Sequence, residues 1–264
     1  MKNRIEKKFE QLKELKKKAF IAFLTAGDPT LKVTEDFVLA FERCGADIVE
    51  LGVPFSDPLA DGPTIQAASQ RALKKGVTLK KVFSLVSRIR KKSQIPIALM
   101  TYYNPVLHFG EENFGRTAKR CGVDGVIVPD LPLEEASCLV KTARKNNFAT
   151  VFFLSPTTSK ERVKAIVKAS SGFIYYVSLT GVTGARRLLP EDIRANVLYA
   201  KRQTKKPVCV GFGVSTPIQI KSIAKIADGV IVGSAIVREI QKNTGRKDLV
   251  KNVSRFVSRL AAGT

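Results

Sequence analysis

Three carboxylates lie in and just after an apolar run near residue 50. Glu50 is inside the run IVELGVP (48–54), and Asp57 and Asp61 are in the segment that follows it. Burial raises the pKa of a carboxyl group and wetter, hydrogen-bonded surroundings keep it low, so two acids in different settings can divide proton donation and acceptance. The spacing therefore indicates acid–base chemistry by Glu50 and Asp61. The alternatives are a structural carboxylate at position 50 and a turn residue at position 61.

Glycine-bearing segments later in the chain favour anion binding. They read TGVTGA (180–185), GFG (211–213) and GSA (233–235), and the last of them opens a helical pattern. Bare backbone amides at a helix start bind phosphate, so we expect a phosphorylated substrate, although each glycine alone could serve a tight turn. Residues 180–189 are also expected to form a mobile lid; an ordinary surface loop is the alternative.

Aromatic residues recur in or beside the apolar runs, at Phe23, Tyr102, Phe153, Tyr175 and Tyr176. They could line a flat pocket. Core packing is the commoner role for any one of them.

Eight short apolar runs must position these residues, and each is typical of a strand. They cover 20–25, 48–53, 95–102, 125–130, 149–154, 173–179, 207–211 and 229–232. Patterns of helical period separate several of the runs, and continuous apolar character is expected of strands buried on both faces of a parallel sheet. Eight such units in ~250 residues predict a (β/α)₈ TIM barrel, with function on the loops after the strands.

A doubly wound open sheet is the alternative fold. Its dinucleotide fingerprint is missing, because GFG (211–213) lacks the third glycine, and the chain contains no Walker-type phosphate loop. Nucleotide binding is therefore disfavoured.

Further signals concern the ends of the barrel and of its helices. Ile5, Phe9 and Leu12 predict an extra amphipathic helix at the N-terminus, and apolar residues spaced over 249–260 predict another at the C-terminus, each plugging or flanking the barrel. Thr158 with Glu161 predicts a capping box, and Thr216 before a proline predicts a second helix start.

Because no Gly/Ser- or Pro-rich linker divides the chain, we expect one domain over residues 1–264.

Composition excludes several classes of protein. The 264 residues are 44% hydrophobic and 26% charged, which is typical of a folded protein. No apolar run approaches the ~20 residues of a membrane span, and the lysine-rich residues 1–20 lack the apolar segment of a signal peptide, so a cytoplasmic location is expected. The four cysteines are far apart and His108 is the only histidine, so no metal site is expected.

The segment ELGVPFSDPLADGPTIQ (50–66) resembles the signature of the tryptophan synthase alpha chain family. The resemblance extends over nearly the whole chain, through LTAGDP (24–29), YNP (103–105), PDLP (129–132), SLTGVTGA (178–185), GFG (211–213) and GSAIV (233–237). The family implies a barrel enzyme of tryptophan biosynthesis. Its members cleave indole-3-glycerol phosphate by a retro-aldol route into indole and glyceraldehyde 3-phosphate.

The resemblance also implies roles for single residues. Glu50 would shuttle protons at the ring carbon and the hydroxyl group, and Asp61 would accept the indole N–H. The remaining site residues would be Gly184, Gly213, Gly233 and Ser234 at the phosphate, Thr183 on the lid, and Phe23, Tyr102, Ile127, Tyr175 and Phe212 around the indole ring.

The family further implies a beta-chain partner that carries pyridoxal phosphate, in an αββα assembly, with no cofactor on this chain. The loops at residues 57–58, 104–105 and 131–132 would face that partner. A stand-alone indole-releasing lyase and a non-catalytic basic binding module are the alternatives.

The net charge of +22 is larger than the resemblance leads us to expect. Basic residues accumulate between Asp61 and Glu111, where the sequence has no acid. We interpret them as a solvated helix face, so nucleic-acid binding is not expected.

Overall fold

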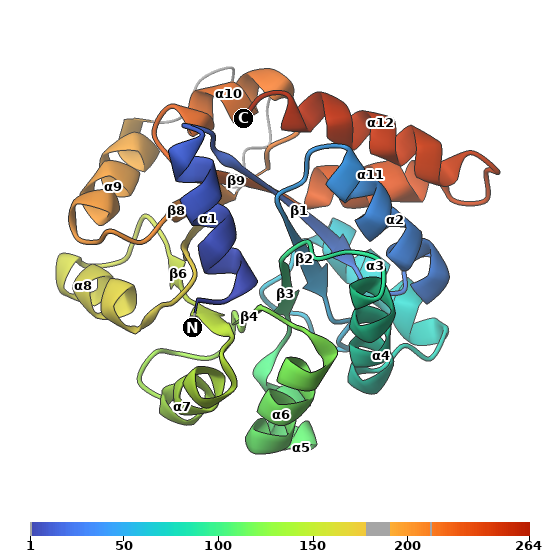
Figure 1. Cartoon of the computed structure of the whole chain (residues 1–264), viewed down its shortest axis with the longest axis horizontal. Helices are drawn as coiled ribbons and strands as arrows, with labels where there is room; N and C mark the ends of the chain where they lie inside the picture. The colour runs from blue at the N-terminus through green and yellow to red at the C-terminus, as the bar shows by residue number, and fades with distance from the viewer. Residues whose placement is uncertain (1, 178–190, 212) are drawn as a thin grey trace.

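The computed structural model describes residues 2–177, 191–211 and 213–264, and it arranges them as a ring of parallel strands enclosed by helices (Figure 1). Hydrogen-bonded neighbours follow the order β5-β4-β3-β2-β1-β9-β8-β7-β6. The strands are β1 Ala19–Thr25, β2 Ile48–Gly52, β3 Ile97–Met100, β4 Gly125–Ile127, β5 Ala149–Val151, β6 Phe153–Leu154, β7 Ile174–Val177, β8 Val208–Gly211 and β9 Gly229–Val232.

The ring closes through the run at residues 149–154, which pairs on both sides. Its first half, β5, pairs with β4, and its second half, β6, pairs with β7. Phe152 lies between the halves, and its carbonyl accepts a hydrogen bond from the Tyr175 N–H at 3.1 Å. β5 and β6 are thus two parts of one predicted strand. The predicted (β/α)₈ barrel is confirmed, as are the additional helices at both ends.

Helix α1 precedes the first strand, and helices α2 to α12 cover the outside of the ring, with at least one after each strand except β5, which continues into β6. Their bounds are α1 Arg4–Glu14, α2 Leu31–Arg43, α3 Pro63–Lys74, α4 Leu79–Arg90, α5 Tyr103–Phe109, α6 Glu111–Cys121, α7 Ser137–Asn146, α8 Lys160–Ala169, α9 Glu191–Arg202, α10 Pro217–Ala224, α11 Ser234–Asn243 and α12 Leu249–Ala261.

One predicted helix start is confirmed and one is wrong. Thr216 caps α10 and forms a capping box with Gln219. At α8 the cap is Ser159, whose hydroxyl accepts the Arg162 N–H. The Thr158 hydroxyl instead accepts the Ser155 N–H at 2.9 Å, inside the preceding turn.

The apolar interior has an outer layer, between strands and helices, and a separate cluster in the lumen of the ring. Helix α1 lies across the amino ends of the strands and closes the lumen from that side (Figure 1). Its buried side chains Ile5, Phe9 and Leu12 belong to the lumen cluster. Helix α12 instead packs on the outside, against α11 and α2.

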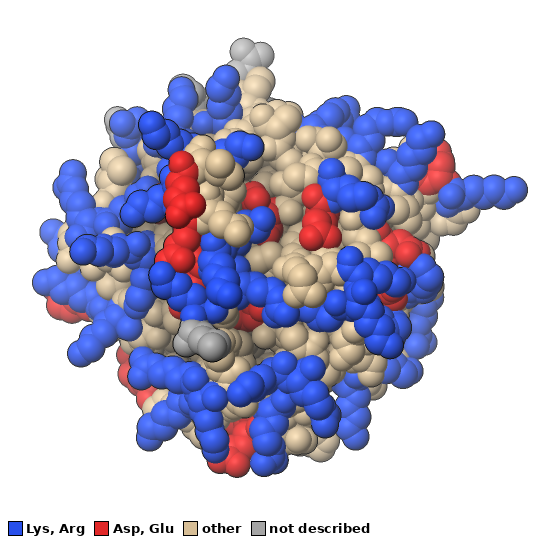
Figure 2. All heavy atoms as spheres, viewed as in Figure 1, with Lys and Arg blue, Asp and Glu red and all other residues tan. Residues whose placement is uncertain are grey.

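Lysine and arginine side chains cover much of the face shown in Figure 2. Several of the basic residues after β2 are ion-paired with acids of neighbouring elements. Arg71 binds Asp28 at 2.7 Å, and Arg90 binds Asp124 at 2.6 Å. Across the described ranges, no helix combines the length and the apolar character needed to cross a membrane.

Candidate active site

A cavity of about 730 Å³ opens at the carboxyl ends of the strands. Phe23 of β1, Met100 of β3 and Tyr175 of β7 form part of its wall. The loop at residues 59–62, the start of α3 and the start of α11 surround the opening. The cavity therefore collects side chains from strands that are far apart in the sequence, at the end of the barrel where a TIM-barrel enzyme carries its chemistry.

Glu50 lies in the lumen of the barrel, in register with Phe23 on one side and Ala98 on the other. The side chain is 1% exposed, and neither carboxyl oxygen has a hydrogen-bond partner within the described part of the chain. Loss of hydration, reinforced by the negative charge of Asp61, raises the Glu50 pKa from 4.5 to about 8. At neutral pH this group is a carboxylic acid with a proton to give.

Asp61 lies in the loop after β2 and is hydrogen-bonded to Tyr102, which follows β3. The Tyr102 hydroxyl donates to Asp61 Oδ2 at 3.1 Å, and the Ala60 N–H donates to that same hydroxyl at 3.0 Å. Burial raises the Asp61 pKa from 3.8 to about 6, and the bond from Tyr102 opposes the rise by favouring the carboxylate. Asp61 is therefore ionised at neutral pH while Glu50 is not.

Glycines at the strand ends make room for two aromatic rings. A Cβ at Gly52 would come within 2.7 Å of the Phe23 ring, and a Cβ at Gly211 within 2.8 Å of the Tyr175 hydroxyl. Because a methyl group at either position would displace the ring, these glycines fix where Phe23 and Tyr175 lie. Both rings face the cavity, which gives it surfaces suited to a planar apolar group.

The side of the cavity formed by β8, β9 and α11 suits an anion. Helix α11 starts at Ser234, and its cap, Gly233, offers no side chain to the free N–H groups. Gly213 has φ +42°, and no atom lies within 4 Å of the place where a Cβ would stand. Arg238, one turn into α11, also lines the cavity. Helix N–H groups and a guanidinium both bind phosphate oxygens.

The predicted site residues do not all reach this cavity. Asp61, Phe23, Tyr175, Gly213, Gly233 and Ser234 line it, and Tyr102 contacts it through Asp61. Ile127 is fully buried in the lumen cluster. Thr183, Gly184 and Phe212, together with the predicted lid at residues 180–189, lie outside the described residues.

Sequence reasoning missed several residues of the cavity wall, and Met100 and Arg238 are the two whose side chains matter most here. Met100 could have been found, since it is two residues after Ala98 on a strand and therefore shares the lumen-facing side. Arg238 could have been found as the residue one helical turn after Ser234. In the described residues, no group of three or more His, Cys, Asp and Glu side chains could hold a metal ion.

Comparisons with known proteins agree over almost the full length. The family model for the tryptophan synthase alpha chain matches residues 9–264. The tryptophan synthase alpha chain of Geotalea daltonii is 50% identical over 260 residues, 98% of each chain. That of Caldanaerobacter subterraneus is 49% identical over 255 residues, 97% of each chain.

Solved structures give the same result. Tryptophan synthase subunit alpha from Legionella pneumophila superposes with a TM-score of 0.93 at 37% identity, covering 100% of this chain and 98% of that one. A chain from the tryptophan synthase a2b2 complex of Pyrococcus furiosus superposes with a TM-score of 0.88 at 43% identity, covering 92% of this chain and 98% of that one.

Proposed function

The chain belongs to the tryptophan synthase alpha chain family, and on that premise we propose that Glu50 and Asp61 carry out its reaction. The reaction is the cleavage of indole-3-glycerol phosphate into indole and glyceraldehyde 3-phosphate, a carbon–carbon lyase step. The observation that carries the assignment is the buried acid Glu50, which has no hydrogen-bond partner among the described residues and feels the charge of the ionised Asp61. Asp61 lines the cavity, whereas Glu50 lies behind its wall.

The proposed chemistry returns Glu50 to its starting state. The Glu50 acid gives its proton to the ring carbon that bears the glycerol chain, and the resulting carboxylate then takes the proton of the adjacent hydroxyl group. As the carbonyl forms, the carbon–carbon bond breaks and its electron pair returns to the ring, which leaves as indole. For this step the buried Glu50 side chain must turn toward a ring held between Phe23 and Tyr175.

Asp61 is proposed to accept the indole N–H. Protonation of the ring carbon places positive charge on the ring nitrogen, so an ionised carboxylate stabilises the transition state more than the substrate. The Tyr102 hydroxyl supports this role because its bond to Oδ2 holds Asp61 in place and favours the charged form.

The phosphate of the substrate is proposed to bind at Gly213, Gly233 and Ser234, with the α11 amides and Arg238 as donors. We also propose the remaining roles expected from the sequence: phosphate binding by Gly184, a lid contact by Thr183, and contacts with the indole ring by Ile127 and Phe212. Distance along the cavity then sets specificity, since the anion and the ring must be held at opposite ends of one substrate.

A beta-chain partner is proposed for the mouth of the barrel. The Pyrococcus furiosus structure is of an a2b2 complex, and the pyridoxal phosphate of such assemblies belongs to the beta chain, while the alpha chain has no cofactor. Leu59 and Leu107 are 92% and 59% exposed and follow β2 and β3 at this end of the barrel. We propose that they contact the beta chain in an αββα assembly.

A cytoplasmic location is proposed as well. Cys44, Cys121, Cys138 and Cys209 are all free thiols. Free thiols are usual in a reducing compartment, whereas oxidising compartments favour disulfides.

The deciding experiment measures indole release from indole-3-glycerol phosphate by Glu50→Gln, with and without an added beta chain. We expect turnover to fall by at least ~10²- to 10⁴-fold, the usual contribution of a general acid or base, while substrate still binds. The control is Glu112→Gln, which removes an exposed carboxylate on α6. Near-normal turnover by Glu50→Gln would reject the assignment, and rates unaffected by the beta chain would favour a stand-alone lyase.

A further inference from the structure

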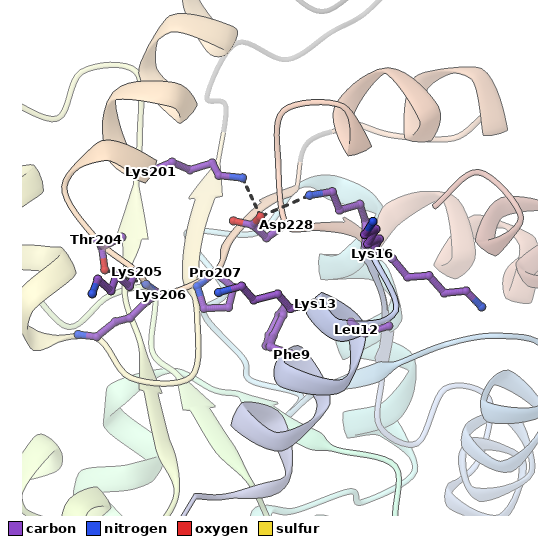
Figure 3. Close-up of a pocket in the computed structure, with 12 residues that line it drawn as sticks. Phe9, Leu12, Lys13, Lys16, Lys201, Thr204, Lys205, Lys206, Pro207 and Asp228 are labelled. Carbon is purple, nitrogen blue, oxygen red and sulfur yellow. Dashed lines mark hydrogen bonds and ion pairs between the residues drawn. The ribbon is translucent and has the colours of Figure 1, made fainter.

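A second cavity, of about 470 Å³, lies at the opposite end of the barrel from the active site (Figure 3). Its wall includes residues immediately before β1, β8 and β9, namely Lys18, Pro207 and Asp228, so it opens at the amino ends of the strands. Phe9 and Leu12 of α1 form its apolar floor. Nothing in the lyase mechanism uses this cavity.

Seven lysines line this cavity, which we call the lysine pocket. Lys13, Lys16, Lys17 and Lys18 come from α1 and the segment after it, and Lys201, Lys205 and Lys206 come from the end of α9 and the turn before β8. Among the described residues that line the pocket, Asp228 is the only acidic one. The pocket therefore joins two basic segments that are almost two hundred residues apart in the chain.

Three of the lysines are already satisfied. Lys201 and Lys18 share one Asp228 oxygen, at 2.7 and 3.5 Å, as the dashed lines of Figure 3 show. Lys206 donates to the Val167 and Ser170 carbonyls, both at 2.6 Å. The Asp228 carboxylate is thus already paired with two lysines, so it does not neutralise the other lysines of the pocket.

The other four lysines have no such partner. Lys13, Lys16, Lys17 and Lys205 are exposed, and none of their ammonium groups makes a hydrogen bond or ion pair with a described residue. The charge of Lys17 does act on Asp47, where it opposes the rise in pKa that burial causes. Lys13 extends from α1 across the pocket toward Pro207 (Figure 3). Like charges gathered in a concave site with an apolar floor raise the local potential and attract a polyvalent anion.

Lys16 adds an independent observation from the backbone. It follows the α1 C-cap with φ 54°, and the N–H of the next residue, Lys17, bonds the Leu12 carbonyl at 2.8 Å. Glycine is the usual residue at this left-handed position of a helix end, because a side chain there is strained. Binding of a ligand by the Lys16 ammonium group would account for a residue type that this helix end disfavours.

We propose that the lysine pocket binds an oligophosphate, an anion with a chain of at least three phosphoryl groups. Four free ammonium groups in one pocket match several negative charges on a single small ligand better than one phosphate. Lysine ammonium groups suit this ligand because they are mobile point charges that fit phosphate oxygens without fixed geometry. A pocket of about 470 Å³, unlike an extended basic groove, does not suit a nucleic-acid backbone.

The test is calorimetric titration of the full chain with inorganic tripolyphosphate at low and at physiological ionic strength. The pocket variant is Lys13→Ala with Lys205→Ala, and the control is Lys80→Ala with Lys119→Ala, two exposed lysines of α4 and α6. Both variants lose the same charge. We expect one-to-one binding that the pocket variant weakens about tenfold and the control less than about twofold.

Further arms identify the source of the phosphate chain. Binding of ATP as tight as that of tripolyphosphate supports recognition of the phosphate chain alone, and tighter binding supports a nucleotide as the source. Equal weakening by the pocket and control variants would overturn the proposal, because it would mean that net charge alone attracts the anion. Affinity for oligonucleotides that increases with their length would overturn it as well, in favour of a nucleic-acid surface.

Lys16→Gly separates binding from folding. Glycine relieves the left-handed backbone, so we expect a melting temperature at or above that of the wild type together with weaker tripolyphosphate binding. Unchanged affinity in this variant and in the pocket variant would reject the pocket. All these variants should release indole at the wild-type rate, because the pocket lies at the other end of the barrel, so this proposal can fail while the lyase assignment holds.

Discussion

Glu50 and Asp61 show how one residue type acquires two protonation states. Both carboxyls lose hydration. Among the described residues, Asp61 gains a donor, the Tyr102 hydroxyl, whereas neither oxygen of Glu50 has a partner. Their pKa values separate accordingly, to about 6 and about 8. Between these values the free enzyme holds a base and an acid together, which is the state that the proposed mechanism requires.

The pH dependence of kcat/KM should therefore be bell-shaped. Ionisation of Asp61 sets the acid limb near pH 6, and loss of the Glu50 proton sets the basic limb near pH 8. Tyr102→Phe removes the bond that favours the Asp61 carboxylate, so the acid limb should move upward by up to about one pH unit, as expected for a bond of ~1.5 kcal/mol to a charged group. Tyr103→Phe, which removes the hydroxyl that bonds Glu111, is the control and should leave both limbs in place. An acid limb unmoved by Tyr102→Phe would contradict the role given to that hydroxyl.

The free energy of unfolding should also fall as pH rises, because of the buried Glu50 carboxyl group. Its folded pKa of about 8 lies above the unfolded value of 4.5, so the folded state keeps a proton that the unfolded state releases. Stability is fully present below about pH 4.5 and is lost progressively up to about pH 8. Glu50→Gln cannot ionise, so its free energy of unfolding should exceed that of the wild type by several kcal/mol near pH 9 and match it near pH 5. Urea denaturation at the two pH values measures this, and a pH-independent difference would show that burial does not raise the pKa.

At the scale of the element, α1 is a part of the barrel core rather than an appendage. Its apolar face enters the lumen, where Phe9 lies 5.9 Å from Phe173 between ring centroids. At its start, Arg4 binds the buried Asp124 at 2.9 Å. The helix thus replaces water at an end of the lumen that the strands alone would leave open.

Phe9→Ala should accordingly destabilise the whole barrel. The side chain is 7% exposed, and truncating a buried phenylalanine typically costs about 3 kcal/mol or more. Leu15→Ala, at the C-cap of the same helix and 64% exposed, should change stability by less than about 0.5 kcal/mol. Equal denaturation midpoints for the two variants would mean that α1 does not plug the lumen.

At the scale of the whole molecule, the net charge of +22 must oppose the compact state. Ion pairs such as Arg90 with Asp124 and Arg71 with Asp28 offset part of this repulsion. On the face shown in Figure 2, lysines and arginines are spread over the surface, where salt screens them.

Salt should therefore stabilise the protein. Raising NaCl from low to physiological concentration screens the surface repulsion, and we expect the melting temperature to rise by about 2–4 °C, the shift that ~1 kcal/mol produces at this size. Scanning calorimetry in rising NaCl checks this. A falling melting temperature would mean that the ion pairs outweigh the repulsion.

The organisation of residues 1–264 as one domain stays a prediction.

The sequence by itself determined the architecture and the identity of the chemical groups. Apolar periodicity depends on neighbours along the chain, so the runs that form β1 to β9 and the face of α1 could be recognised locally. The signature around Glu50 and Asp61 likewise identified the family, because it is contiguous in the sequence.

Only the tertiary structure decided how those groups behave. The pKa of Glu50, the bond from Tyr102 to Asp61 and the entry of Met100 and Arg238 into the cavity depend on which distant segments meet. The α8 cap is likewise Ser159 rather than Thr158, whose hydroxyl bonds within the preceding turn. The lysine pocket exists for the same reason, since closure of the barrel brings the end of α1 beside the turn before β8. Burial and electrostatic fields are sums over neighbours in space, and local sequence does not contain them.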